Sequence, residues 1–113
     1  LDTKTAVLMR HPGRQTLLGI DGLYRYGDSL LAVQNGVRPQ RLLRLALNGS
    51  GEKIETIEIL ESSLPIFDDP TLGVIVGEAF YFIANSHWPQ FDAEGNLPPP
   101  ERLTPPTILR VAL

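Results

Sequence analysis

The chain has 113 residues, of which 42% are hydrophobic and 20% charged, a composition that favours a folded domain over a disordered segment. Its net charge of −3 and its scattered basic residues argue against a nucleic-acid partner, which needs a concentrated Lys/Arg surface. Disulfides, thiolate zinc sites and cysteine nucleophiles are excluded because the chain has no cysteine. No apolar run approaches the length of a membrane span, so we expect no membrane partner, and the sequence leaves the compartment open.

Frequent Gly and Pro residues divide the chain into short β-branched and aromatic runs, a pattern typical of strands joined by turns. The first of these runs, residues 5–10, predicts an outermost strand. Residues 1–4 would be the end of the strand before it. We therefore expect 1–18 to hold the outer strand of a preceding sheet and a connection.

Residues 19–62 predict one complete four-stranded antiparallel unit. The segment 23–35 contains two apolar strands around Gly27-Asp28, a pair suited to a two-residue hairpin because glycine accepts a positive φ angle. A third strand is expected over 41–47. Polar and apolar residues alternate over 53–60, which predicts a fourth strand with one face exposed to solvent.

Residues 63–113 repeat this pattern. The segment 73–85 lies over 23–35 at an offset of 50, with Gly77-Glu78 in place of Gly27-Asp28. The third strand, 107–113, lies over 41–47 at an offset of 66. The second unit therefore carries an insertion, predicted as a proline-rich loop over 86–106, and it lacks a fourth strand.

Four-stranded antiparallel units repeated at about 50 residues are typical of β-propeller blades. The sequence thus predicts an all-β chain that forms a partial β-propeller, about two four-stranded antiparallel blades of a larger ring. Such a ring is commonly closed by pairing its last strand with one from its N-terminal region, which removes an open edge. A free-standing β-sandwich of seven or eight strands is the alternative, although a sandwich gives no reason for the repeat.

Four short motifs in this order resemble the last two blades of the SMP-30/gluconolactonase-like family of six-bladed propellers. They are GIDGL at 19–23, VQNG at 33–36, RLLRL at 41–45 and DPT at 69–71. The resemblance covers about residues 19–113. It implies a divalent cation, calcium or zinc, at one mouth of the channel, and hydrolysis of sugar lactones or related cyclic esters in members that are enzymes. The remaining ligands of such a site would come from blades that this chain does not contain.

Asp21 is the candidate metal ligand. The resemblance assigns a cation to the aspartate of this Asp-Gly step, and blade geometry places Asp21 at the same mouth as Asn35 and Thr71. A carboxylate beside amide oxygens suits a hard cation, although one carboxylate is too few for calcium. The alternative is that Asp21-Gly22 only forms a turn.

Asn35 and Asn85 are candidate substrate-binding or rim residues, because they end the second strand of each unit. Asn35 precedes Gly36, and Asn-Gly forms turns whatever the function. Asn85 occupies the equivalent position without a following glycine, so the sequence indicates a turn less strongly there.

His87 and Trp88 begin the proline-rich insertion, which we expect to pack over the channel mouth as a rim or lid. They could contact substrate, and His87 could assist proton transfer. Alternatively, Trp88 and Phe91 pin the loop and His87 is a bystander. Asp68 and Asp69 should point to different sides, so a shared catalytic pair is not expected.

These features predict the C-terminal part of a cation-dependent lactonase-type propeller. This chain alone should be inactive. A non-catalytic propeller that serves as a binding or scaffolding module is the competing hypothesis. The expected partners are the rest of its own propeller or other copies of the chain, together with a small lactone or sugar-like ligand.

Overall fold

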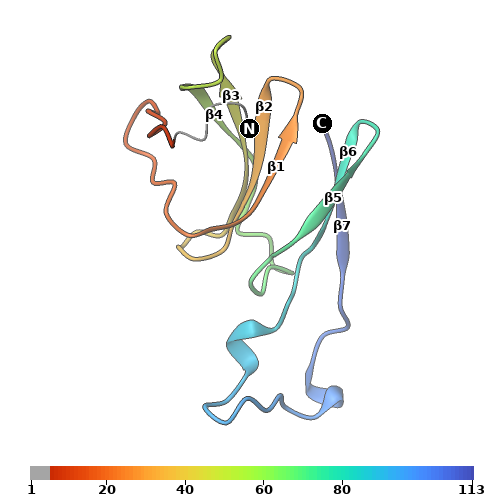
Figure 1. Cartoon of the computed structure of the whole chain (residues 1–113). Helices are drawn as coiled ribbons and strands as arrows, with labels where there is room; N and C mark the ends of the chain where they lie inside the picture. Colours follow the sequence, from red (N-terminus) through yellow and green to blue (C-terminus); the bar gives the residue numbers. More distant parts are fainter. Residues whose placement is uncertain (1–5) are drawn as a thin grey trace.

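The structure, a computed structural model, describes residues 6–113 and consists of two antiparallel sheets (Figure 1). The first sheet contains, in chain order, β1 (Ile20–Tyr26), β2 (Ser29–Gln34), β3 (Arg41–Leu47) and β4 (Ile54–Ser62). The second contains β5 (Gly73–Val76), β6 (Ala79–Ile83) and β7 (Ile108–Ala112). Helical structure in the described residues is limited to two 3₁₀ turns, η1 (Trp88–Gln90) and η2 (Pro100–Arg102), so the all-β prediction is confirmed. No helix in this part of the chain is long and apolar enough to cross a membrane.

The two sheets share one pairing register. Leu23 pairs with Ala32 in the first sheet, and Gly73 pairs with Phe82, 50 residues further along each strand, in the second. The turns agree as well, because Gly27 and Gly77 have φ angles of 54° and 58°, values that glycine adopts without a Cβ clash. The sequence repeat is therefore also a repeat of strand pairing and turn geometry.

The core lies between the facing sides of the sheets. Leu31, Val33 and Leu42 from the first sheet form a buried cluster with Phe80 and Phe82 from the second, and each is at most 1% exposed. Residues on alternate strand positions share a face, so the period-2 pattern sends these side chains to the same layer. The rings of Phe80 and Phe82 stack with centroids 5.7 Å apart.

Two residues of the N-terminal segment pack on the far face of the first sheet. Met9 and Leu17 pack against a second buried cluster on this face, which includes Ala32 and Leu43. This differs from the strand expected over 5–10. Residues 6–9 form no strand, and Arg10 makes a single parallel bridge to Lys53. Met9 and Leu17 pack on the sheet face, while Val7, Leu8 and Leu18 stay exposed, so the segment crosses this face instead of pairing along an edge. The expected strand end at 1–4, and residue 5, lie outside the described residues.

The sheets approach each other most closely at their first strands, β1 and β5. Tyr24 of β1 accepts a hydrogen bond at its hydroxyl from the backbone N–H of Gly73 in β5, at 2.9 Å. Its ring lies 5.1 Å from that of Phe80. Gly73 has no side chain, and this allows the Phe80 ring to pack directly against the β5 backbone.

Replacing Gly73 with alanine should destabilise the contact between the sheets. A Cβ atom there would lie 2.4 Å from the Tyr81 carbonyl oxygen and 2.5 Å from the Phe80 ring, so backbone or ring must move. We expect Gly73→Ala to lower the free energy of unfolding by about 1–3 kcal/mol, the usual cost of overpacking. Denaturant unfolding measures this. Gly49→Ala is the control, because a Cβ at Gly49 meets nothing within 4 Å; equal stability loss in both variants would contradict the argument.

Candidate functional site

Asp21 projects from an irregularity in β1. Ile20 pairs with Gln34 and Gly22 pairs with Val33, so Asp21 is the extra residue of a β-bulge. A bulge bends its strand and redirects the side chain of the extra residue. The carboxylate of Asp21 is thereby exposed at the end of β1, on the side where the second sheet begins.

The Asp21 carboxylate is the centre of a small polar group, the Asp21 cluster, which also contains Asn35 and Thr71. Its Oδ2 atom accepts hydrogen bonds from Thr71 Oγ1 at 2.6 Å and from Asn35 Nδ2 at 3.1 Å. Asn35 Nδ2 also donates to the carbonyl of Pro70 at 3.1 Å. Asp21 and Thr71 occupy the same position in the two repeats, so the structure brings equivalent residues of neighbouring units into contact.

A close contact between two glycines holds Asn35 in place. The backbone N–H groups of Asn35 and Gly36 both donate to the carbonyl of Gly19, at 3.1 and 3.0 Å. A Cβ on Gly19 would lie 2.7 Å from Gly36 Cα, so only glycine permits this approach. The Asn35-Gly36 step therefore has the structural role that its composition suggested, and this role also aims the Asn35 amide at Asp21.

Asn85 lies elsewhere and holds the ends of the insertion together. Its side chain is buried, with Oδ1 accepting from the N–H of Thr107 at 2.7 Å and Nδ2 donating to the carbonyl of Pro105 at 3.0 Å. Both ends of the amide thus bind the irregular segment that leads into β7. Asn85 forms no side-chain hydrogen bond with Asp21, Asn35 or Thr71.

His87 forms a second structural link in the insertion. The residue is 9% exposed and has a left-handed backbone conformation with φ of 61°. Its Nδ1 atom lies 3.1 Å from Asp68 Oδ2 and its Nε2 atom lies 2.8 Å from the Thr104 carbonyl oxygen. The ring therefore connects the segment before β5 with the far end of the insertion.

Trp88 is 65% exposed and packs against Phe91, with ring centroids 5.4 Å apart. Phe91 is 40% exposed, so both rings lie at the surface of the insertion. The insertion itself extends away from both sheets (Figure 1). The insertion also borders an open, mostly apolar hollow of about 460 Å³. Residues lining it are Ser86, His87, Leu97, Pro100, Leu103, Thr104, Pro105 and Pro106.

Asp68 and Asp69 point to different partners, as the extended chain suggested. Asp68 contacts His87, whereas Asp69 accepts a hydrogen bond from Gln40 and lies 3.6 Å from the Arg38 guanidinium. Sequence reasoning did not find the pairing of Asp68 with His87. Nor did it find the hydroxyl that Thr71 supplies to Asp21. Each of these contacts joins residues 19 or 50 positions apart, and no local pattern marks them.

The Asp21 cluster alone does not make a complete cation site. It offers a carboxylate, an amide and a hydroxyl, whereas calcium takes six to eight oxygens and zinc prefers nitrogen or sulfur ligands. Among residues 6–113, no three His, Cys, Asp or Glu side chains are grouped in a way that could hold a metal ion. Further ligands would have to come from outside these two sheets.

Comparison with known proteins gives no relative for this chain: no protein-family model matches it, and no significant match is found among curated proteins or solved structures.

Removing the imidazole of His87 should loosen the insertion. His87→Ala loses contacts with Asp68 and Thr104, and each buried hydrogen bond contributes about 0.5–1.5 kcal/mol. We expect tryptic cleavage after the exposed Arg102 to accelerate roughly tenfold, since 1.4 kcal/mol of local opening corresponds to that factor. Mass spectrometry of a limited digest measures the rate. His11→Ala, at an exposed histidine, should leave the rate unchanged, and an unaltered rate in His87→Ala would refute the structural role.

Proposed function

We propose that the chain forms two neighbouring blades of a six-bladed β-propeller. Three observations support this: the two sheets have equivalent registers, they are closest at their first strands, and equivalent residues Asp21 and Thr71 meet there. Neighbouring blades around a channel bring their innermost strands together in this way. The second sheet in this proposal is a blade that lacks its fourth strand.

We further propose that the complete ring is a divalent-cation-dependent hydrolase of lactones or related cyclic esters. The observation that carries this proposal is the exposed Asp21 carboxylate, placed by a bulge at the junction of β1 and β5 with amide and hydroxyl oxygens beside it. An oxygen-rich group of this kind could supply part of a calcium site. The other sheets of the ring would have to supply the remaining ligands, and no catalytic step is assigned to residues of this chain.

A non-catalytic binding or scaffolding module is the second candidate, and the hydrogen bonds of Asp21 favour it. Oδ2 already accepts from Thr71 and Asn35, so the carboxylate has partners without a cation. In this case Asp21 serves to join two sheets. Fold alone does not decide between these functions, because propellers of one architecture host many activities.

Calcium titration of the complete ring separates the two candidates. If Asp21 is a ligand, Asp21→Asn should weaken calcium binding by about tenfold or more, because it removes a charged oxygen from the site. Isothermal calorimetry measures the affinity, and a sugar lactone as substrate shows whether hydrolysis depends on calcium. Asp28→Asn is the matched control, since Asp28 is an exposed carboxylate in the turn between β1 and β2.

Binding of equal strength in wild type and Asp21→Asn would reject Asp21 as a ligand. Calcium binding without lactone hydrolysis would favour the binding module. In the scaffold role, Asp21→Asn should instead lower the free energy of unfolding in calcium-free buffer by about 1 kcal/mol, because an amide accepts from Thr71 and Asn35 less strongly than a carboxylate.

A further inference from the structure

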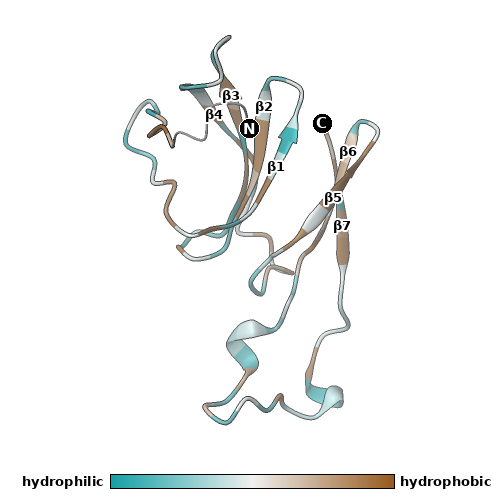
Figure 2. Ribbon diagram, in the orientation of Figure 1, coloured by the Kyte–Doolittle hydropathy of each residue, from teal (hydrophilic) through white to brown (hydrophobic). Residues whose placement is uncertain are grey.

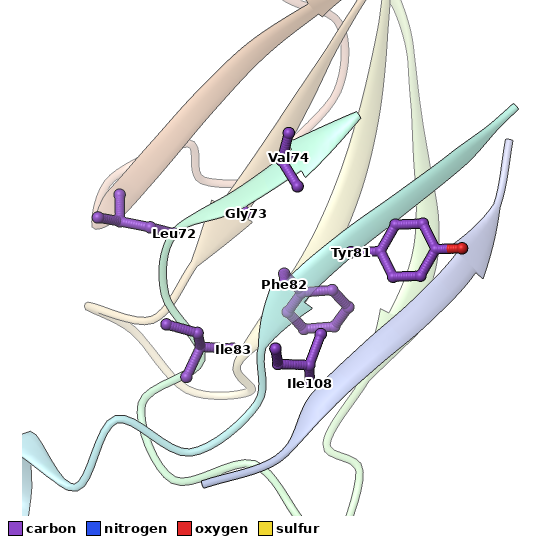
Figure 3. A pocket seen from close by; sticks show the side chains of 7 residues that line it. All are labelled: Leu72, Gly73, Val74, Tyr81, Phe82, Ile83 and Ile108. Carbon is purple, nitrogen blue, oxygen red and sulfur yellow. The ribbon is translucent and has the colours of Figure 1, made fainter. Parts of the chain in front are cut away.

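The outer edge of β7 has no partner strand within residues 6–113. The second sheet has the order β5-β6-β7, so β7 pairs with β6 on one side only (Figure 1). Figure 3 shows this pairing at the beginning of β7, where Ile108 lies beside Ile83 of β6. The strands of this sheet are largely hydrophobic (Figure 2). An open edge of this kind can pair with another extended segment.

The backbone groups that face this open edge follow from the pairing with β6. The carbonyl of Thr107, just before β7, and the N–H of Leu113, just after it, bond to residues next to β6 at 2.9 Å. In an antiparallel pair every second residue bonds to the same neighbour, and the residues between them face the other side. Ile108, Arg110 and Ala112 therefore direct their N–H and carbonyl groups to the open edge, where an added strand can bond to them.

The first sheet shows which side chains suit a strand at this edge. There β3 occupies the position of β7 in the repeat, and β4 pairs along the edge that β7 leaves open. The central pair has opposite charges, because Arg44 lies opposite Glu58 in the register. The aliphatic pairs on its two sides are Leu43 with Ile59 and Leu45 with Ile57.

The strand β7 repeats the three β3 positions that this pairing uses. Leu109, Arg110 and Val111 lie 66 positions after Leu43, Arg44 and Leu45. Leu43 and Leu45 are at most 2% exposed, whereas Leu109 and Val111 are only partly buried. Aliphatic side chains on a neighbouring strand would remove more of this apolar surface from water.

The charge of Arg110 discriminates between possible occupants of the edge. Arg110 is exposed and lies in the middle of β7. Opposite charges that face each other across two strands are favourable, whereas like charges are destabilising. Two copies of β7 that paired around this residue would place two guanidinium groups opposite each other. The edge therefore favours a strand with an acidic residue at this position over a second copy of itself.

We propose that the open edge of β7 binds an extended, antiparallel strand with an acidic residue opposite Arg110 and aliphatic residues opposite Leu109 and Val111. The strand comes from a part of the ring outside residues 6–113, so its source rests on the proposed blade arrangement. The chemistry of the edge rests only on the two registers and on the repeat. The proposal thus states what the fourth strand of the second sheet carries.

A synthetic peptide that copies residues 53–62, labelled with a fluorophore, tests this edge as a stand-in for the missing strand. Titration of the 113-residue chain into the peptide, followed by fluorescence anisotropy, should show saturable binding. Hydrogen exchange with mass spectrometry locates the site, and the peptide should slow exchange over residues 108–112. No binding up to about 1 mM, the weak end of the affinity scale, or protection elsewhere in the chain, would overturn the proposal.

A charge exchange tests the role of Arg110. The Glu58→Lys peptide should bind the wild-type chain about three- to tenfold more weakly, because like charges then face each other. Arg110→Glu in the chain should weaken binding of the unchanged peptide and restore binding of the Glu58→Lys peptide. Arg14→Glu is the matched control, since Arg14 is an exposed arginine outside both sheets, and it should leave binding unchanged. Circular dichroism checks that both chain variants are folded.

Binding that is insensitive to both charge changes would also overturn the proposal. A dimer in sedimentation velocity that the peptide does not dissociate would overturn it in favour of a second copy at this edge. The measurement uses calcium-free buffer, and Asp21→Asn should leave peptide binding unchanged. Failure of the cation site and failure of the edge are therefore distinguishable.

Discussion

Two phenylalanine rings of β6, Phe80 and Phe82, fill the space between the sheets. Both are at most 1% exposed, and they contact apolar residues of β2 and β3 on the opposite sheet. Large aromatic side chains bury more apolar area than any others, so this contact dominates the attachment of the second sheet. The hydrogen bond of Thr71 to Asp21, which crosses between the sheets, depends on this attachment.

The Asp21 cluster depends on that attachment. Asp21 and Asn35 belong to the first sheet, whereas Thr71 belongs to the segment before β5, and the three meet only because β1 and β5 lie side by side. The cluster is thus a product of sheet packing and of the bulge at Asp21. The insertion is held separately, through Asn85 and His87, so its movements need not be transmitted to Asp21.

The two sheets differ in how far the faces that point away from the shared core are buried. Met9 and Leu17 pack on the far face of the first sheet, whereas Val74, Val76 and Ile108 of the second sheet are exposed to water. Repeat units of this type bury their apolar faces only by stacking on neighbours. The second sheet therefore leaves exposed strand positions that are buried in the first repeat.

Much of the candidate site followed from local sequence signals. Asp21, Asn35 and Thr71 were expected at one end of their strands, and the structure brings these three together. For Asn85 and His87, the sequence predicted a place at the rim but not their hydrogen-bond partners. Asn85 binds Pro105 and Thr107, and His87 contacts Asp68 and Thr104. Those partners lie across a proline-rich insertion whose path no period-2 pattern describes.

The sequence by itself determined the all-β class, the hairpins at Gly27 and Gly77, and the repeat of strand positions. These are consequences of alternation and of backbone φ preferences, which act over a few residues. Only the tertiary structure decided that Met9 and Leu17 pack on a sheet face, that Asp21 meets Thr71, and that His87 links Asp68 to Thr104. Such contacts join residues far apart in the chain, and they form because packing the sheets together leaves those polar groups as the available partners.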